Sequence, residues 1–212
     1  MRAFAQRIVP AAFDIFQYWI GGTAAKRRLI MRHYTNQKHV LEVGCGTGNI
    51  ASAFLNHDVD YTGLDVDGPA IDYASRKFRH KRGFSFVCGE LQKHSFRNVF
   101  DFIVFAGVLH HVADATATAM LEFSRRILSE DGVVLVSDPI KPSPGDSPLI
   151  KLDGKLDRGQ FLRTSEDLSA LLMRLRGLRV VRQECPGVAP FPVCSGLTVA
   201  NFGVFLLKKC AV

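Results

Sequence analysis

The sequence lacks any apolar run approaching the roughly 20 residues that a membrane-spanning helix needs, although hydrophobic residues make up 47% of its 212 positions. Its first residues also lack the continuous apolar core of a secretory signal, because Gln6, Arg7, Pro10 and Asp14 interrupt it. The five cysteines are odd in number and scattered, and none forms a C-x-x-C pair. We therefore expect a reduced, cytoplasmic protein without a metal site.

Acidic residues are scarce at the start of the chain. Most of the net charge of +7 therefore comes from this N-terminal segment. Residues 1–39 hold seven Lys or Arg and one acid, Asp14, whereas twenty basic and nineteen acidic residues follow. A solvated helix face, an anionic substrate, an anionic membrane surface and nucleic acid are all compatible with such a segment. Peripheral membrane contact through this segment stays open, and nothing indicates an oligomeric state.

The spacing of apolar residues predicts one α/β domain. Short apolar runs near 39–43, 60–64, 84–87 and 101–105 indicate parallel strands covered on both faces, and a fifth strand ends at Asp138. A helix is expected over 47–56, and later helices are expected before the fifth strand and after Thr164. Two last strands, near 178–184 and 199–207, would close the sheet.

Two segments flank or interrupt this domain. Residues 1–38 are expected to form an N-terminal helical cap, and the domain proper would span 39–212. Residues 139–163 are rich in Pro and Gly, which indicates an insertion with little regular structure on the substrate side.

A glycine-rich turn after the first strand is the most informative motif. It reads E-x-G-x-G-x-G from Glu42 to Gly48, and the second strand ends in Asp65. A dinucleotide fingerprint would need G-x-G-x-x-G, but its third glycine position is Asn49, and no P-loop lysine follows. Glycines let the backbone approach a ligand, and a carboxylate on the neighbouring strand accepts hydrogen bonds from ribose hydroxyls. A nucleoside cofactor is therefore expected across the two strand ends.

Together with three later segments, 85–91, 100–112 and 127–136, this motif resembles the class I S-adenosylmethionine-dependent methyltransferases. The resemblance implies a Rossmann-like, seven-stranded, mostly parallel sheet with helices on both faces and an antiparallel last strand. It also implies S-adenosyl-L-methionine as cofactor and S-adenosyl-L-homocysteine as product. In this family the glycine turn passes the methionine part, and the acid on the second strand holds the ribose. An acid after the third strand, more often Asp than the Glu found here, lies by the adenine. The cofactor-binding residues implied are Glu42, Gly44, Cys45, Gly46, Gly48, Asp65, Val66, Glu90, Leu91 and Ala106.

Candidates for catalysis are fewer, because methyl transfer requires alignment and water exclusion more than a nucleophile or metal. His110 follows the fourth strand, at the edge where ligands of open α/β sheets bind. In the phosphoethanolamine methyltransferases a histidine in a similar Leu-His position works with a tyrosine of the N-terminal segment, which by resemblance implies His110 and Tyr18. The alternative is that His110 only shapes its loop. Arg158 and Arg163 are candidate contacts for an anionic acceptor.

These observations favour methyl transfer to an oxygen or nitrogen atom of a small molecule. A nucleic-acid or protein methyltransferase is the first alternative, suggested by the basic N-terminus. The [DNS]-P-P-[YFW] loop of amino-methylating DNA enzymes is missing after the fourth strand, where the chain reads Ala106 to His111, so the sequence argues against nucleic acid. A third alternative is a protein of this fold that binds the cofactor without transferring its methyl group.

Overall fold

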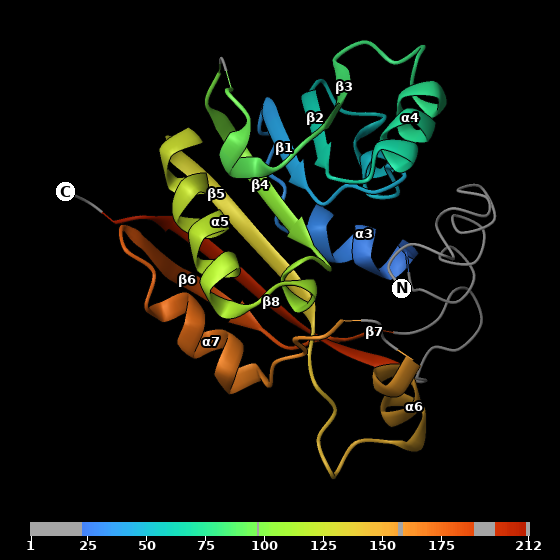
Figure 1. Cartoon of the computed structure of the whole chain (residues 1–212), viewed down its shortest axis with the longest axis vertical. Coiled ribbons are helices and arrows are strands. Elements are labelled where there is room, and N and C mark those ends of the chain that lie inside the picture. The colour runs from blue at the N-terminus through green and yellow to red at the C-terminus, as the bar shows by residue number, and fades with distance from the viewer. Residues whose placement is uncertain (1–22, 97, 157–158, 189–197, 211–212) are drawn as a thin grey trace.

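The structure, a computed structural model, describes residues 23–96, 98–156, 159–188 and 198–210. Its centre is a sheet whose main path runs β3-β2-β1-β4-β5-β8-β6 (Figure 1). The strands are β1 (His39–Val43), β2 (Asp60–Asp65), β3 (Phe84–Cys88), β4 (Phe100–Ala106), β5 (Leu128–Pro139), β6 (Leu178–Glu184), β7 (Gly187–Val188) and β8 (Ala200–Lys209).

Strand directions agree with the expected fold class. Strands β1 to β5 pair in parallel, and β8 lies antiparallel between β5 and β6. The short β7 is an addition that the sequence did not predict, and it pairs with β8. The mostly parallel, Rossmann-like sheet with an antiparallel last strand is therefore confirmed.

The sheet is covered on both faces, as its almost continuously apolar strands require. On one face α5 and α7 pack against alternate strand residues such as Leu41 and Ile103 (Figure 1). On the other face α3, η1 and the residue that ends α4, Phe78, pack in one cluster with the intervening residues Val40 and Phe102. The helices are α3 (Thr23–Met31), α4 (Gly68–Lys77), α5 (Asp114–Ile127), α6 (Pro148–Leu156) and α7 (Ser165–Met173), with short 3-10 helices η1 (Ala51–Phe54), η2 (Leu91–Lys93) and η3 (Leu109–His111).

Two expectations about local structure are wrong. The helix expected over 47–56 is a series of turns followed by the single 3-10 turn η1, because Gly46 and Gly48 adopt positive φ values that a right-handed helix cannot include. The insertion at 139–163 holds a helix, α6, despite its composition. Pro148 is tolerated in the first turn, where the missing N–H would have no intrahelical partner, and Gly154 lets the helix approach Pro142 closely.

Strand register brings the predicted site together. Val43 of β1 lies opposite Leu64 of β2 and Phe105 of β4. The next residue of each strand therefore emerges at the same carboxyl edge of the sheet. Of the expected N-terminal cap, the structure describes residues from Thr23 onward, and α3 buries Ile30 completely against the sheet.

Candidate cofactor and active site

The turn after β1 has a backbone that only glycine adopts readily. Gly44 has φ +73° and Gly46 has φ +50°. A Cβ on Gly44 would lie 2.6 Å from a methyl group of Val108, whereas one on Gly46 would have nothing within 4 Å. The turn therefore packs tightly against the segment after β4 and keeps open space on its other side, where a ligand can lie against bare backbone.

Asp65 fixes the shape of this turn from the end of β2. One carboxylate oxygen accepts a hydrogen bond from the backbone N–H of Gly46 at 2.7 Å, and the other accepts one from Asp67 at 2.9 Å. Asp67 in turn caps α4 by accepting from the N–H of Ala70. Each carboxylate oxygen has two lone pairs and can accept a further hydrogen bond from a hydroxyl.

Val66, directly after Asp65, is an exposed apolar residue in an otherwise polar turn, with 69% of its surface accessible. After the neighbouring strand β3, Glu90 is exposed and pairs with Lys93 at 2.8 Å. Leu91 is buried in the core. An apolar surface beside a flexible carboxylate suits the face and the polar rim of a purine.

Glu42 lies beneath the turn and is nearly inaccessible to solvent. Its carboxylate accepts a hydrogen bond from the hydroxyl of Tyr61. Burial raises the pKa of Glu42 to about 8, and the nearby Asp65 raises it too, while the bond from Tyr61 and the charge of Arg27 lower it. Burial also raises the pKa of the Tyr61 hydroxyl well above its usual value. Glu42 therefore exchanges its proton near neutral pH.

Cys45 is a buried residue of the turn and not an activated thiol. Burial, followed by the charges of Glu42 and Asp65, raises the pKa of its thiol far above the usual value. A Cβ on Gly63 would lie 2.8 Å from the Cys45 sulfur, so the thiol fills the space under the turn. A raised pKa removes the thiolate that nucleophilic chemistry would need.

The loop after β4 carries His110. Its ring is buried, and Nδ1 lies 3.3 Å from Oδ1 of Asp138, a buried residue near the end of β5. The same oxygen accepts hydrogen bonds from the N–H groups of Val108 at 2.8 Å and Leu109 at 3.1 Å. Ala106 ends β4 opposite Ser137 and is partly buried. Tyr18, the predicted partner of His110, lies outside the described residues.

Arg163 is not available to an acceptor, contrary to expectation. Its side chain is buried and donates to the carbonyls of Leu109 at 2.7 Å and Val112 at 2.9 Å, and it pairs with Asp114 at 2.7 Å. The N–H of Phe161 also donates to the carbonyl of His110 at 2.9 Å. The end of the insertion therefore braces the His110 loop. Arg158 lies outside the described residues.

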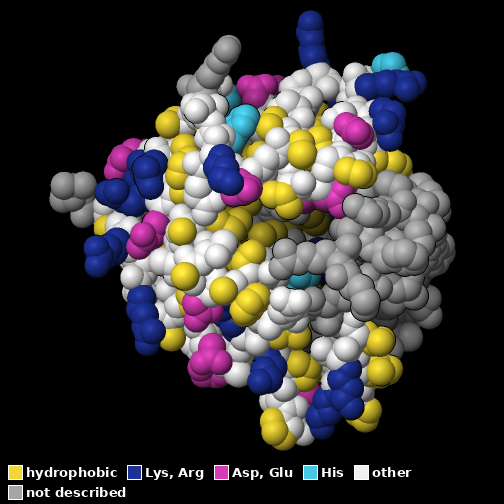
Figure 2. Space-filling model, viewed as in Figure 1, with side chains coloured by type: hydrophobic (Ala, Val, Ile, Leu, Met, Phe, Trp, Pro, Cys, Tyr) yellow, Lys and Arg dark blue, Asp and Glu magenta, His cyan; other side chains and the backbone are white. Residues whose placement is uncertain are grey.

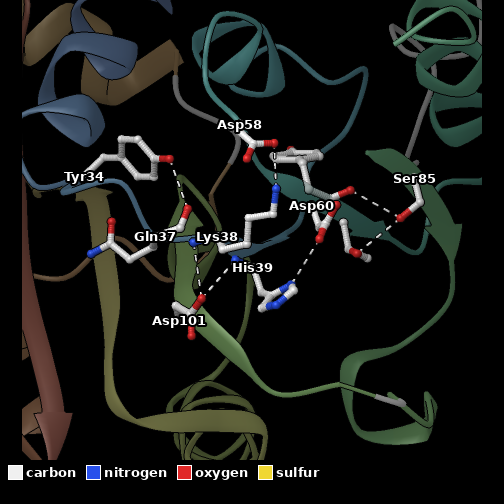
Figure 3. A network of polar contacts seen from close by, with 10 residues as sticks. Tyr34, Gln37, Lys38, His39, Asp58, Asp60, Ser85 and Asp101 are labelled. Atoms are coloured by element: carbon white, nitrogen blue, oxygen red, sulfur yellow. Dashed lines mark hydrogen bonds and ion pairs between the residues drawn. The ribbon is translucent and has the colours of Figure 1, made fainter. Parts of the chain in front are cut away.

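A second polar network lies at the opposite, amino edge of the sheet (Figure 3). There Oδ2 of Asp101 accepts hydrogen bonds from the N–H groups of Lys38 at 3.2 Å and His39 at 3.0 Å, and the His39 ring lies 3.5 Å from Asp60. An open groove of about 370 Å³ borders this network and the loop 94–96. The carboxylates of this network fix the start of β1, so the network has a structural role. In the part of the chain that the structure describes, no group of three or more His, Cys, Asp or Glu is placed to hold a metal ion.

The sequence did not predict that Asp138 contacts His110 or that Arg163 braces the His110 loop. It also did not predict a role for Arg27, whose side chain donates to the carbonyl of Asn49 in the turn at 2.7 Å. Asp138 directly precedes Pro139 at the end of β5, and this marks it only as a strand end. No local pattern could have revealed contacts across 22 to 54 residues.

The strand order and the glycine turn define the class of open α/β proteins that bind a nucleoside at the carboxyl edge. Residues 41–134 match a family model described as a methyltransferase domain. Nodulation protein S of Rhizobium tropici is 33% identical over 82 residues, which cover 39% of this chain and 34% of that protein. Ubiquinone biosynthesis O-methyltransferase of Coxiella burnetii is 33% identical over 81 residues, 36% of this chain and 34% of the relative. The chain thus matches about a third of the length of these curated relatives.

Solved structures share the fold. The O-methyltransferase NcsB1 from neocarzinostatin biosynthesis, crystallised with S-adenosylmethionine and 2-hydroxy-5-methyl naphthoic acid, superposes with a TM-score of 0.66 at 23% identity, over 98% of this chain and 60% of that one. A SAM-dependent methyltransferase of Aquifex aeolicus gives a TM-score of 0.64 at 17% identity, over 91% and 92% of the two chains. Residues 41–134 are thus similar to a methyltransferase domain, and the chain shares the fold of SAM-dependent methyltransferases. Both findings agree with the resemblance of the four motifs to the class I enzymes. The cofactor of this class is S-adenosylmethionine, which agrees with the cofactor inferred from the glycine turn.

Proposed function

We propose that this protein transfers a methyl group from S-adenosylmethionine to an oxygen or nitrogen atom of a small molecule. The observation that carries the proposal is the pairing of Asp65 with the N–H of Gly46. In the bound state this pairing would set a carboxylate at the ribose and bare glycine backbone beside it, within the residues that match a methyltransferase domain.

The residues at the carboxyl edge fit the cofactor. The space beyond Gly46 is open to a ligand, Val66 offers an apolar surface, and Asp65 retains lone pairs for hydroxyls. We assign the methionine part to the turn and the adenosine part to the ends of β2 and β3. The residues assigned to the cofactor are Glu42, Gly44, Cys45, Gly46, Gly48, Asp65, Val66, Glu90, Leu91 and Ala106.

When bound, the cofactor supplies an electrophilic methyl group on a sulfonium, and a neutral thioether remains after transfer. The protein aligns the acceptor with that methyl group, excludes water and removes one proton. We assign proton removal to His110, which lies in η3, the short helix that follows β4 at the same edge. Tyr18 remains a proposed partner of His110.

The arrangement of the chain is part of the proposal. Residues 1–38 would act as a cap and residues 139–163 as the substrate-side insertion. The insertion contacts the His110 loop through Phe161 and Arg163, which supports a role beside the acceptor.

A small-molecule acceptor is supported by what the similar proteins are said to act on or bind. NcsB1 was crystallised with naphthoic acids, and another structure of this fold, with a TM-score of 0.68 and 19% identity, is mitomycin 7-O-methyltransferase. Among the described side chains that Figure 2 colours by type, basic and acidic ones are interspersed and form no basic stripe, so these residues give no support to the alternative of a nucleic-acid enzyme. We place the reaction in the cytoplasm, in keeping with the cysteine pattern. In the described part of the chain, every helix is too short or too polar to cross a bilayer.

Replacing Asp65 by alanine tests the ribose assignment. Asp65→Ala should weaken binding of S-adenosylmethionine by about 1–3 kcal/mol, because the hydrogen bonds to the ribose are lost and the turn loses its anchor. The matched control is Asp60→Ala, at the other end of the same strand, where the carboxylate faces the amino edge. Calorimetric titration of both variants measures the difference. An unchanged dissociation constant for Asp65→Ala would overturn the assignment.

A further inference from the structure

Helix α6, in the insertion after β5, exposes a stripe of leucines. Leu149, Leu152 and Leu156 are 41%, 52% and 70% exposed. They are spaced three and four residues apart in the helix, so they lie on one face. Figure 1 places α6 beyond the carboxyl ends of β4 and β5, at one end of the molecule, and in Figure 2 apolar and basic side chains lie side by side there.

The helix cannot turn these leucines inward, because its opposite face is already packed. Ile150 is buried, and a Cβ on Gly154 would lie 2.4 Å from the ring of Pro142, so the helix lies close against the segment that precedes it. Among the described residues eight large apolar side chains are exposed, and four of them, the three leucines and Phe161, belong to residues 139–163. Exposed apolar surface that is concentrated in one segment marks a site of interaction.

The charged residues of α6 and of the loop before it are divided between two sides. Lys141 and Lys155 are exposed. The two acids face the protein: Asp146 accepts a hydrogen bond from the amide of Asn201 on β8, and Asp153 borders the space between the helix and that strand. The outer surface therefore combines leucines with cations, which is the composition of helices that lie on anionic membranes.

A bilayer fits this surface better than a second protein does. Three leucines on a helix of nine residues offer on the order of a few hundred Å² of apolar surface, whereas a stable protein interface buries roughly 800 Å² on each partner. A small apolar surface suffices at a membrane, because insertion of apolar side chains adds to the attraction between cations and anionic headgroups.

We propose that α6 docks the protein on an anionic membrane surface, with its leucine stripe among the acyl chains and Lys141 and Lys155 at the phosphate groups. This docking goes beyond the proposed function and holds whether or not a methyl group is transferred. The insertion is hydrogen-bonded to the loop after β4, so docking also brings the carboxyl edge of the sheet close to the bilayer.

The first test reads the insertion of α6 directly, in the full chain with vesicles of phosphatidylglycerol and phosphatidylcholine. Leu152→Trp is made in a Trp19→Phe background, because Trp19 is the only tryptophan. Met173→Trp in the same background is the control, at an exposed position on α7. We expect the emission of Leu152→Trp to shift to shorter wavelengths and to be quenched by brominated acyl chains, with no change in Met173→Trp. Unshifted emission of Leu152→Trp in the presence of vesicles would overturn the proposal.

The second test measures how much the leucines contribute to binding. Co-sedimentation with the same vesicles should give an affinity lower by about tenfold or more for Leu152→Gln with Leu156→Gln, because two apolar side chains no longer leave water. Met173→Gln with Val181→Gln, at two exposed apolar positions outside the insertion, is the control and should bind as the wild-type protein does. Urea unfolding checks that all of these surface variants remain folded. Equal affinities of the wild-type protein and the leucine variant would contradict docking through α6.

Lipid charge and self-association separate the membrane from other occupants of this surface. Lys141→Ser with Lys155→Ser should weaken binding to the anionic vesicles about fivefold per lysine, and vesicles of phosphatidylcholine alone should bind the wild-type protein weakly. Equal binding to neutral and anionic vesicles would rule out recognition of an anionic surface. A dimer, detected by light scattering without lipid and lost in the leucine variant, would show that the stripe binds a second copy of the chain instead.

Discussion

At the scale of single residues, the site contains two buried acids, and each accepts hydrogen bonds from the protein. Glu42 and Asp138 both lie below 3% exposure, a costly position for a carboxyl group unless it is hydrogen-bonded or protonated. Glu42 accepts from Tyr61, and Asp138 accepts from two backbone N–H groups. The bond to Tyr61 joins β1 to β2 beneath the glycine turn, and the bonds to Asp138 fix the loop after β4.

Glu42 gives a pH-dependent stability whose sign follows from its pKa. The folded-state pKa of about 8 is above the unfolded value near 4.5, so between these values the unfolded chain releases a proton that the folded protein retains. The free energy of unfolding should therefore fall as pH rises through this window, by up to about 1 kcal/mol per pH unit.

Glu42→Gln should remove this contribution, since the amide cannot ionise. Urea unfolding at about pH 5 and about pH 8 measures it: relative to wild type, the variant should gain stability at the higher pH. Glu90→Gln, at an exposed acid, is the control and should show no such gain. Equal pH dependence in the wild type and Glu42→Gln would show that Glu42 is already ionised in the folded protein.

The residue scale also shows how far one sequence can predict a site. The glycines and Asp65 were found because their spacing is local and their chemistry specific. Asp138 and Arg163 act on backbone groups 29 to 54 residues away, and a buried arginine that donates to carbonyls looks the same in sequence as a surface arginine that awaits an anion.

At the scale of elements, the insertion after β5 and the loop after β4 behave as one unit. The carbonyl of Arg163 accepts from the N–H of Lys141, and its side chain donates to the carbonyls of Leu109 and Val112. Through its backbone and its side chain, Arg163 thereby joins both ends of the insertion to the segment that carries His110.

Arg163→Lys should therefore lower the free energy of unfolding by about 2 kcal/mol, because an ammonium cannot satisfy the planar set of acceptors that the guanidinium reaches. The matched control is Arg179→Lys on β6, an exposed position, which should change stability by only a few tenths of a kcal/mol. Urea titrations of the two variants give the comparison. A loss no larger for Arg163 than for Arg179 would mean that the brace contributes little.

The elements also divide into those that local patterns predict and those that they do not. Strands β1, β2 and β4 were predicted within about a residue, because buried parallel strands are short apolar runs. The helix over 47–56 was wrong, because apolar spacing after the turn outweighed the backbone demands of Gly46 and Gly48. Helix α6 was missed because Pro and Gly were interpreted as loop residues, whereas Pro148 begins the helix and Gly154 permits its contact with Pro142.

At the scale of the whole molecule, the net positive charge does not arise from the α/β domain. The excess of basic residues belongs to residues 1–39, and the remaining chain is nearly neutral. The predicted fold class is confirmed, because strand order follows from the succession of βα units, whereas the role of the basic segment does not follow from the fold.

Contact of this segment with an anionic membrane surface, which the sequence leaves open, can be tested on the full chain. Co-sedimentation with vesicles containing phosphatidylglycerol should be strong at low salt, lost at high salt, and reduced in a variant with Arg2→Ser and Arg7→Ser, because basic residues near an anionic surface are each worth about 1 kcal/mol. Lys81→Ser with Arg82→Ser, in the exposed turn after α4, is the charge-matched control. Equal recovery of all three proteins in the supernatant at low salt would show that the segment makes no such contact.

The central claim is that the carboxyl edge of this sheet binds S-adenosylmethionine. Isothermal titration of the purified full chain with S-adenosylmethionine, S-adenosylhomocysteine and NAD tests it most directly. We predict dissociation constants in the micromolar range for both adenosyl ligands and no heat of binding for NAD, because the turn ends in Asn49 where a dinucleotide fingerprint has glycine. Binding of NAD alone, or of none of the three, would contradict the claim.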